Sequence, residues 1–285
     1  MHVNRLSLKP RIALCLIVAG SLALIAHAQQ PVTLPDVHKL MAEVEAHQKQ
    51  LDQVRENFTY TSLTTTEEVD GSGRVTKTET EEMEHFFVNG HPIGRTVKKN
   101  GKPLSEKEQG KETERVTKLV EKAEKTPSGQ PLNGHTISVR KLLEVMEVRN
   151  PRRMAYRGRP TIVFDFAGRK NAKTHGMEED LSKKLEGSIW VDEQDRQVSH
   201  LEVRFMDNFR VGGGLVATIQ KGSNFAFDQA PVGSGLWMPT GGDGSIQARV
   251  LLLKGIRERF HERDYDYKRF RTETEQGKDA HVVGK

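Results

Sequence analysis

Alternating apolar and polar residues dominate the second half of the chain. In the run from 197 to 205, Leu201 and Val203 are interleaved with the charged residues Glu202 and Arg204. Successive side chains of an extended strand point to opposite faces, so this run predicts a strand with one apolar and one polar face. Further short runs, each bounded by turn residues, cover residues 187–192, 215–222, 223–227 and 236–239. Together these runs predict an antiparallel meander that buries one face.

The first hundred residues after the N-terminus predict a helix followed by hairpin-linked strands. Apolar residues recur at helical spacing from 35 to 56, and Asp36 can cap this helix. Asp70-Gly-Ser-Gly73 and Asn89-Gly90 are turn sequences that separate strand-like runs. The strands predicted on either side of these turns cover residues 57–69, 74–88 and 91–99.

Helices and loops are expected between these hairpins and the meander. Ser105 and Glu108 form a capping box that predicts a charged, mostly solvated helix to about residue 125. An apolar stripe predicts another helix from Thr136 or Ser138 to about Glu147. The other elements expected are a strand at 161–166, a short helix at 177–185, strands at 246–253 and 256–270, and loops at 126–134, 149–159, 167–174 and 240–244.

The N-terminus has the composition of a secretory signal peptide. Basic residues precede an apolar run from Ile12 to Ile25, and Ala26-His27-Ala28 provides a small-residue cleavage site. We therefore expect residues 1–28 to be removed, residues 29–271 to form one domain, and residues 272–285 to be a disordered tail. An uncleaved anchor helix is the alternative, although the run is short for a span of about 20 residues.

The single cysteine and the net charge exclude several classes of protein. The only cysteine, Cys15, lies inside the apolar run rather than at its end, so no lipid anchor is expected. The mature chain then has no disulfide, which favours a bacterial envelope over a disulfide-stapled secreted scaffold. The predicted signal contains three of the 44 basic residues and none of the 39 acidic ones. The resulting mature net charge of +2 is too small to indicate nucleic-acid binding.

The sequence carries no recognisable catalytic or metal-binding signature. None of its 11 histidines forms an H-x-x-x-H or H-E-x-x-H pair, and His261-Glu-Arg-Asp264 lies in an alternating strand. Gly233-Ser234-Gly235 lacks the spacing of a serine nucleophile elbow. Gly212-Gly-Gly214 opens no helix, so we expect a hairpin there rather than a phosphate cradle. We therefore expect no enzyme, no metal site and no cofactor.

One block of sequence points to a known group of proteins. It comprises Gly187-Ser-Ile-Trp-Val-Asp192, Val198-Ser-His-Leu-Glu-Val203, Lys221-Gly-Ser223, Phe225 and Gly235-Leu-Trp-Met-Pro239. This block resembles the outer-membrane lipoprotein-sorting families, the LolA-like and LolB-like carriers. The resemblance implies a strongly curved antiparallel half-barrel of the α+β class, with helices across its concave face. It also implies a periplasmic protein that shields and hands over a lipid moiety without catalysing a reaction.

The resemblance further implies an apolar cavity between the helices and the sheet. The strand patterns supply the candidate lining residues Phe164, Phe166, Trp190, Leu201, Val203, Phe205, Phe225, Phe227, Leu251 and Leu253. Each of them could equally belong to an ordinary core. The expected ligand is a lipid or lipoprotein acyl chain, and an envelope protein is a second expected partner. The alternatives are an envelope scaffold or sensor module of the same fold with a filled core, and an unrecognised hydrolase.

Overall fold

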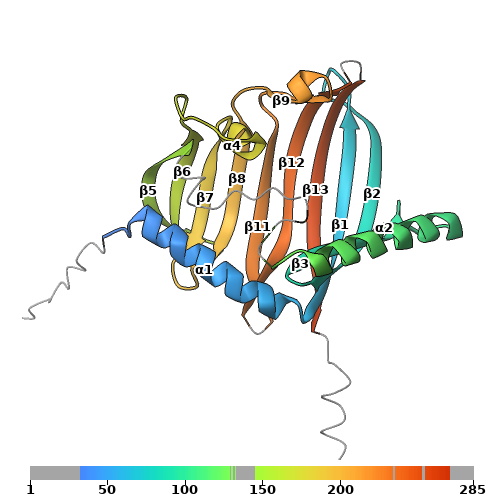
Figure 1. Cartoon of the computed structure of the whole chain (residues 1–285), viewed down its shortest axis with the longest axis horizontal. Coiled ribbons are helices and arrows are strands. Elements are labelled where there is room, and N and C mark those ends of the chain that lie inside the picture. Colours follow the sequence, from blue (N-terminus) through green and yellow to red (C-terminus); the bar gives the residue numbers. More distant parts are fainter. Residues whose placement is uncertain are drawn as a thin grey trace, which may run out of the picture. The chain divides into compact units, whose positions relative to one another are not determined.

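A single large antiparallel sheet makes up most of the computed structural model, which describes residues 33–128, 130, 132, 145–233, 235–251 and 254–269. In these residues the sheet has 13 strands in the order β4-β3-β2-β1-β13-β12-β11-β8-β7-β6-β5, with β9 and β10 paired beside β12. Its end strands β4 and β5 do not pair with each other, so the sheet is open, and Figure 1 shows β5 at one edge. The fold is therefore the α+β curved half-barrel predicted from the sequence.

The predicted strands and helices are largely confirmed. The strands are β1 (Phe58–Val69), β2 (Val75–Val88), β3 (His91–Lys99), β4 (Lys102–Pro103), β5 (Met146–Tyr156), β6 (Arg159–Gly168), β7 (Leu185–Asp192), β8 (Val198–Phe205), β9 (Phe209–Val211), β10 (Ala217–Ile219), β11 (Asn224–Val232), β12 (Leu236–Val250) and β13 (Lys254–Arg269). The helices are α1 (Val37–Arg55), α2 (Glu106–Lys125), the short α4 (Met177–Ser182) and the 3-10 turn η1 (Gly212–Gly214).

Tight turns explain why neighbouring strands pair in this register. Asn89 and Gly90 between β2 and β3 both have positive φ, at 50° and 77°. Arg157 and Gly158 between β5 and β6 also have positive φ, at 49° and 79°. Positive φ at both central positions defines the type I′ turn, whose twist matches that of the flanking strands in a two-residue hairpin. Asparagine and glycine adopt this conformation at little cost, whereas arginine does so rarely.

The segment 149–159, predicted as a basic loop, is instead the strand β5 and its turn into β6. Its residues are mostly exposed, and arginines occupy many of its positions. The strand lies at the edge of the sheet and pairs only with β6 in the described residues. Charged side chains are common on edge strands because they prevent pairing with other chains. The arginines that suggested a loop therefore belong to an edge strand of the sheet. The helix expected over 136–147 cannot end at Glu147, because β5 begins at Met146; residues 136–144 lie outside the described residues.

A second correction concerns β12, which runs without interruption through the loop predicted at 240–244. A Cβ atom at Gly242 would lie 2.5 Å from the Ala226 carbonyl oxygen, and one at Gly244 would lie 2.6 Å from that of Asn224. Glycine is therefore needed here because the neighbouring backbone approaches closely, not because the chain turns. The strand predicted at 246–253 ends at Val250, and the strand predicted at 215–222 shrinks to β10.

Helix α1 is fixed to one face of the sheet along its whole length. Near its start, Leu40, Met41 and Val44 pack against the sheet, and Leu40 is only 1% exposed. At its end the buried Arg55 side chain donates from its η2 nitrogen to the Trp237 carbonyl oxygen over 2.8 Å. The same nitrogen lies 2.9 Å from Gln229 Oε1. Hydrophobic packing and a buried hydrogen-bonded cation therefore hold opposite ends of α1.

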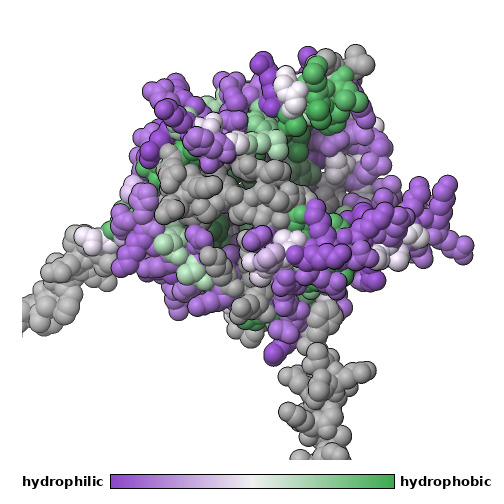
Figure 2. Space-filling model, in the orientation of Figure 1, coloured by the Kyte–Doolittle hydropathy of each residue, from purple (hydrophilic) through white to green (hydrophobic). Residues whose placement is uncertain are grey.

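Helix α2 contacts β3 and β2 but is otherwise solvated, as its sequence predicts. The predicted capping box forms, since Glu108 accepts a 2.9 Å hydrogen bond from the Ser105 amide. Ala123 is its fully buried residue, and Asn89 donates to the Thr126 carbonyl oxygen just beyond the helix over 2.7 Å. Figure 2 shows the outward surface of α2 as predominantly hydrophilic.

None of the helices in the described ranges is long and apolar enough to cross a membrane. The predicted signal peptide (1–28) and C-terminal tail (272–285) lie outside those ranges.

Candidate functional site

Strand register places most of the predicted lining residues on one face of the sheet. Phe164 pairs with Ile189, and Ile189 in turn pairs with Leu201, which lies opposite Phe227. Residues paired across neighbouring antiparallel strands point to the same face, so four strands contribute one apolar row. A second, parallel row contains Phe166, Gly187, Val203 and Phe225.

Helix α1 covers only part of this face. Phe164 is 2% exposed because it belongs to the cluster formed with α1, and Val203 and Phe205 are also buried. Phe225, by contrast, is 37% exposed, and three other aromatic or aliphatic side chains are half-buried. We call the four accessible residues the apolar floor; they are Phe166, Leu201, Phe225 and Phe227. The predicted lining residues therefore divide into a packed group and an accessible one.

Glycines lie beside the apolar floor, and aromatic rings pack over two of them. The ζ carbon of Phe166 lies 2.7 Å from where a Cβ of Gly187 would be, so the ring covers this glycine. On β12, Gly242 pairs with Phe227 and Gly244 pairs with Phe225. The Phe260 ring lies over Gly244, since its ζ carbon is 2.6 Å from where a Cβ of this glycine would be.

Replacing Gly187 with alanine should destabilise the protein by about 2 kcal/mol. The added methyl group would collide with the Glu202 carbonyl oxygen and press on the Phe166 ring, so β7 and β8 would have to separate. Urea unfolding followed by circular dichroism measures this loss.

Gly110→Ala is the matched control, because nothing lies within 4 Å of a Cβ at this position in α2. Alanine has the higher helix propensity, so this control should gain about 0.5–1 kcal/mol. Equal effects of the two substitutions would contradict the close approach at Gly187.

Two other predicted lining residues do not lie on this apolar face, and a third lies outside the described residues. Trp190 pairs with Val163 and His200 and therefore points to the opposite face of the sheet. Leu251 lies in the turn after β12 and is 65% exposed. Leu253 lies outside the described residues. The alternation within β7 was a usable signal, since Ile189 and Val191 face α1 and Trp190 lies between them.

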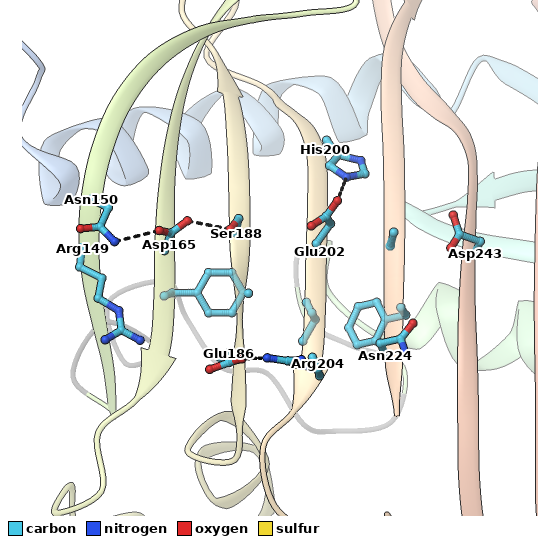
Figure 3. Close-up of a pocket in the computed structure, with 15 residues that line it drawn as sticks. Arg149, Asn150, Asp165, Glu186, Ser188, His200, Glu202, Arg204, Asn224 and Asp243 are labelled. Atoms are coloured by element: carbon cyan, nitrogen blue, oxygen red, sulfur yellow. Dashed lines mark hydrogen bonds and ion pairs between the residues drawn. The ribbon is translucent and has the colours of Figure 1, made fainter. Parts of the chain in front are cut away.

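The opposite face holds a groove of about 730 Å³ whose lining contains many charged and polar residues together with Phe166, Val203 and Phe225. Figure 3 views it with α1 behind the strands, and its labelled residues come from β5, β6, β7, β8, β11 and β12. Asp165 accepts from Asn150 Nδ2 at 3.0 Å and from Ser188 Oγ at 2.7 Å. Glu186 and Arg204 form an ion pair below them in this view. These side chains therefore satisfy one another's hydrogen-bonding capacity, as is usual for polar groups in proteins.

His200 is the most connected residue on this face. Its Nδ1 lies 2.8 Å from Asp228 Oδ1 and its Nε2 lies 3.1 Å from Glu202 Oε1. The hydroxyl of Tyr156 donates to the same Asp228 oxygen over 2.7 Å, and its ring stacks on the imidazole. Both imidazole nitrogens can donate only when the ring is protonated. Asp228 and His200 were not found from the sequence, because their contact depends on how β8 and β11 pair.

Electrostatic interactions favour the charged forms of His200 and Asp228. Burial by itself would lower the pKa of His200, but its hydrogen bonds with Asp228 and Glu202 raise it above the ordinary value. Burial likewise opposes ionisation of Asp228, yet hydrogen bonds from His200 and Tyr156 lower the pKa of this carboxyl. Burial and the hydrogen bond to Asp228 raise the pKa of Tyr156 to about 12. An imidazolium held between carboxylates is suited to a structural ion pair and poorly suited to act as a general base.

No metal centre stands out in the part of the chain that the structure describes. There, no group of three or more His, Cys, Asp or Glu side chains is arranged to hold an ion. The absence of a metal site and of a cofactor remains a prediction from the sequence.

Known proteins resemble this chain only in structure. No family model and no curated protein matches its sequence. A LolA superfamily protein from Nitrosomonas europaea aligns with 80% of this chain and 94% of its own, with 13% identity and a TM-score of 0.32. A putative outer membrane lipoprotein-sorting protein domain from Vibrio parahaemolyticus covers 86% of this chain and 99% of its own, with 10% identity and a TM-score of 0.38.

The Pseudomonas aeruginosa MucA/MucB complex also matches, over 81% of this chain and 99% of that one, with 8% identity and a TM-score of 0.25. The superfamily of the first match is the one that the sequence block resembles. At such identities and TM-scores, however, these likenesses say nothing of function. Function therefore has to be argued from the side chains themselves.

Proposed function

We propose that the protein is exported to the bacterial envelope and binds a lipid or lipoprotein acyl chain non-covalently on the apolar floor. The observation that carries this proposal is the continuous apolar face over β6, β7, β8 and β11. Its two rows contain only aromatic, aliphatic and glycine residues. Four of these side chains remain accessible beside α1.

The energetics suit a flexible hydrocarbon. An acyl chain gains about 0.8 kcal/mol for each CH₂ group that leaves water, and it needs no hydrogen-bond partner. A surface of aromatic rings and glycines provides contact area without requiring a ligand of fixed shape. Such binding requires no catalytic residue, so we propose a carrier or binding protein rather than an enzyme.

A scaffold or interaction module of the same fold is the second candidate. It is favoured by the charged and polar residues in the groove on the opposite face and by the burial of Phe164 and Val203, which are 2% and 5% exposed. In that case the apolar floor would be the edge of an ordinary core, and the protein would act through protein contacts alone.

Replacing Leu201 and Phe227 together with serine should weaken acyl-chain binding more than tenfold. The two side chains lie opposite each other in the first row, and losing each removes about 1.5 kcal/mol or more of hydrophobic contact. Displacement of a fluorescent sixteen-carbon fatty acid measures the affinity, and native mass spectrometry of the purified protein detects bound lipid.

Met154→Ser is the matched control, because Met154 is 43% exposed and pairs with Thr161, away from the apolar floor. It should leave the affinity unchanged. A lipid-free mass together with no fatty-acid binding by the unaltered protein would eliminate the carrier and leave the interaction module.

A further inference from the structure

Three large aliphatic side chains are exposed together at one end of the sheet. Leu215 is 67% exposed, Leu251 is 65% exposed and Val216 is 52% exposed. Soluble proteins rarely expose aliphatic residues in a cluster unless the cluster contacts something. Figure 2 shows hydrophobic surface at the end where Figure 1 places β9.

Backbone contacts bring these residues together from two distant segments. Strand β10 pairs with β12, with Ala217 opposite Val250, so Leu215 and Val216 reach the turn that follows β12. The amide of Leu251 donates to the Val216 carbonyl oxygen over 3.0 Å. The aliphatic cluster is therefore built into the fold at this end of the sheet.

The charged residues within these two segments are all basic, and the acidic residues Asp207 and Glu258 flank them. We define the basic apolar tip as residues 209–221 together with residues 246–251 and 254–257. It contains five basic residues and no acidic one, and the five are Arg210, Lys221, Arg249, Lys254 and Arg257. Three of them, Arg210, Lys221 and Arg249, line a groove of about 540 Å³ together with Leu215. This local charge contrasts with the near balance of the whole mature chain.

We propose that the basic apolar tip docks on the surface of an anionic lipid bilayer. Exposed aliphatic side chains can enter the boundary between headgroups and acyl chains, and surrounding cations attract anionic headgroups. A second copy of this chain would be a poor occupant, because two such tips would face each other with like charges. The tip also lacks an exposed aromatic anchor of the kind that dominates protein–protein interfaces. This docking does not depend on ligand binding at the apolar floor.

Co-sedimentation of the full chain with vesicles tests the proposal. Vesicles of phosphatidylcholine containing 30% phosphatidylglycerol should bind the protein at least tenfold more tightly than phosphatidylcholine alone. The triple variant Leu215→Ser, Val216→Ser, Leu251→Ser should lose at least tenfold in affinity for the anionic vesicles. The double variant Arg210→Gln, Arg249→Gln should reduce both the affinity and its dependence on salt.

Val75→Ser combined with Met177→Ser is the matched control, because both side chains are exposed outside the tip, at 46% and 47%. It should bind like the unaltered chain, and near-ultraviolet circular dichroism shows that each variant is folded. The proposal is overturned if the unaltered chain ignores anionic vesicles, or if the folded triple variant binds them equally well. It is also overturned if sedimentation shows a dimer that the triple variant abolishes, since the tip would then be an interface between copies.

Discussion

Asp192→Ala is expected to destabilise the protein by about 3 kcal/mol, because it would remove a fully buried carboxylate and leave the half-buried Arg159 guanidinium without its main partner. The Asp192 side chain is fully buried and receives Arg159 Nε at 2.6 Å. It also accepts the amides of Gln194 at 3.0 Å and Asp195 at 2.7 Å. These bonds shape the turn between β7 and β8, and Arg159 also contacts the Trp237 ring. Urea unfolding at pH 7 measures the loss.

The pH dependence of this contribution follows from the direction of the pKa shift. Burial would raise the pKa of Asp192, but the hydrogen bonds from Arg159 and the Asp195 amide lower it below the ordinary value. A carboxyl whose folded-state pKa is depressed contributes stability above its unfolded pKa and loses it as the pH falls through the folded value. The difference between the Asp192→Ala variant and the unaltered chain should therefore shrink at strongly acidic pH.

Glu193→Ala is the control within the same turn. Glu193 pairs with Arg153 at 2.6 Å, but both side chains are about 30% exposed (31% and 28%). Partly solvated pairs contribute little, so the control should lose at most about 1 kcal/mol. Equal losses for the two substitutions would show that burial of Asp192 does not dominate this network.

Asp264→Asn is expected to stabilise the protein at alkaline pH. Asp264 is 7% exposed on β13, and neither of its carboxylate oxygens has a hydrogen-bond partner. Burial, with a smaller contribution from the charge of Glu262, raises the pKa of Asp264 to about 7. The native state therefore favours the neutral acid, and deprotonation of the folded protein is costly.

The sign of the effect follows from proton linkage. Since the folded pKa lies above the unfolded one, Asp264 lowers the stability of the unaltered chain as the pH rises from about 4 to about 7. The neutral asparagine does not titrate. The stability difference in favour of Asp264→Asn should accordingly grow by about 4 kcal/mol between pH 4 and pH 8.

Asp266→Asn provides the matched control on the same strand. The Asp266 side chain is 47% exposed and pairs with Lys268, so its stability curve should run nearly parallel to that of the unaltered chain. Urea unfolding at pH 4, 6 and 8 gives all three curves. A curve for Asp264→Asn that also runs parallel would mean that Asp264 is ionised without cost.

Much of the fold could be predicted because local signals agree with the tertiary structure. The Asn89-Gly90 turn, the Ser105–Glu108 capping box and the alternation in β8 each have a local physical cause, and the structure contains all three. The prediction of secondary structure failed where the same residue type is typical of two different local structures. Arginines in β5 suggested a loop although they protect an edge strand, and glycines in β12 suggested a turn although they allow close approach of strands.

The candidate site was predictable in part. Phe164, Leu201 and Phe227 were assigned to one apolar face, and the register places them in one row. Trp190 was assigned to the same face but points to the other one. The accessibility of each side chain depends on where α1 crosses the sheet, and this follows from packing between residues more than 100 positions apart.

By itself, the sequence determined most of the succession of strands and helices, except at β5 and within β12, and the apolar character of alternate strand positions, because these depend on neighbouring residues. Only the tertiary structure decided which apolar residues are core and which are accessible, that His200 meets Asp228, and that Leu215, Val216 and Leu251 gather among cations. The physical reason is that strand register and helix placement are set by contacts between distant segments, and a shift of one residue in register would turn each of these side chains to the other face.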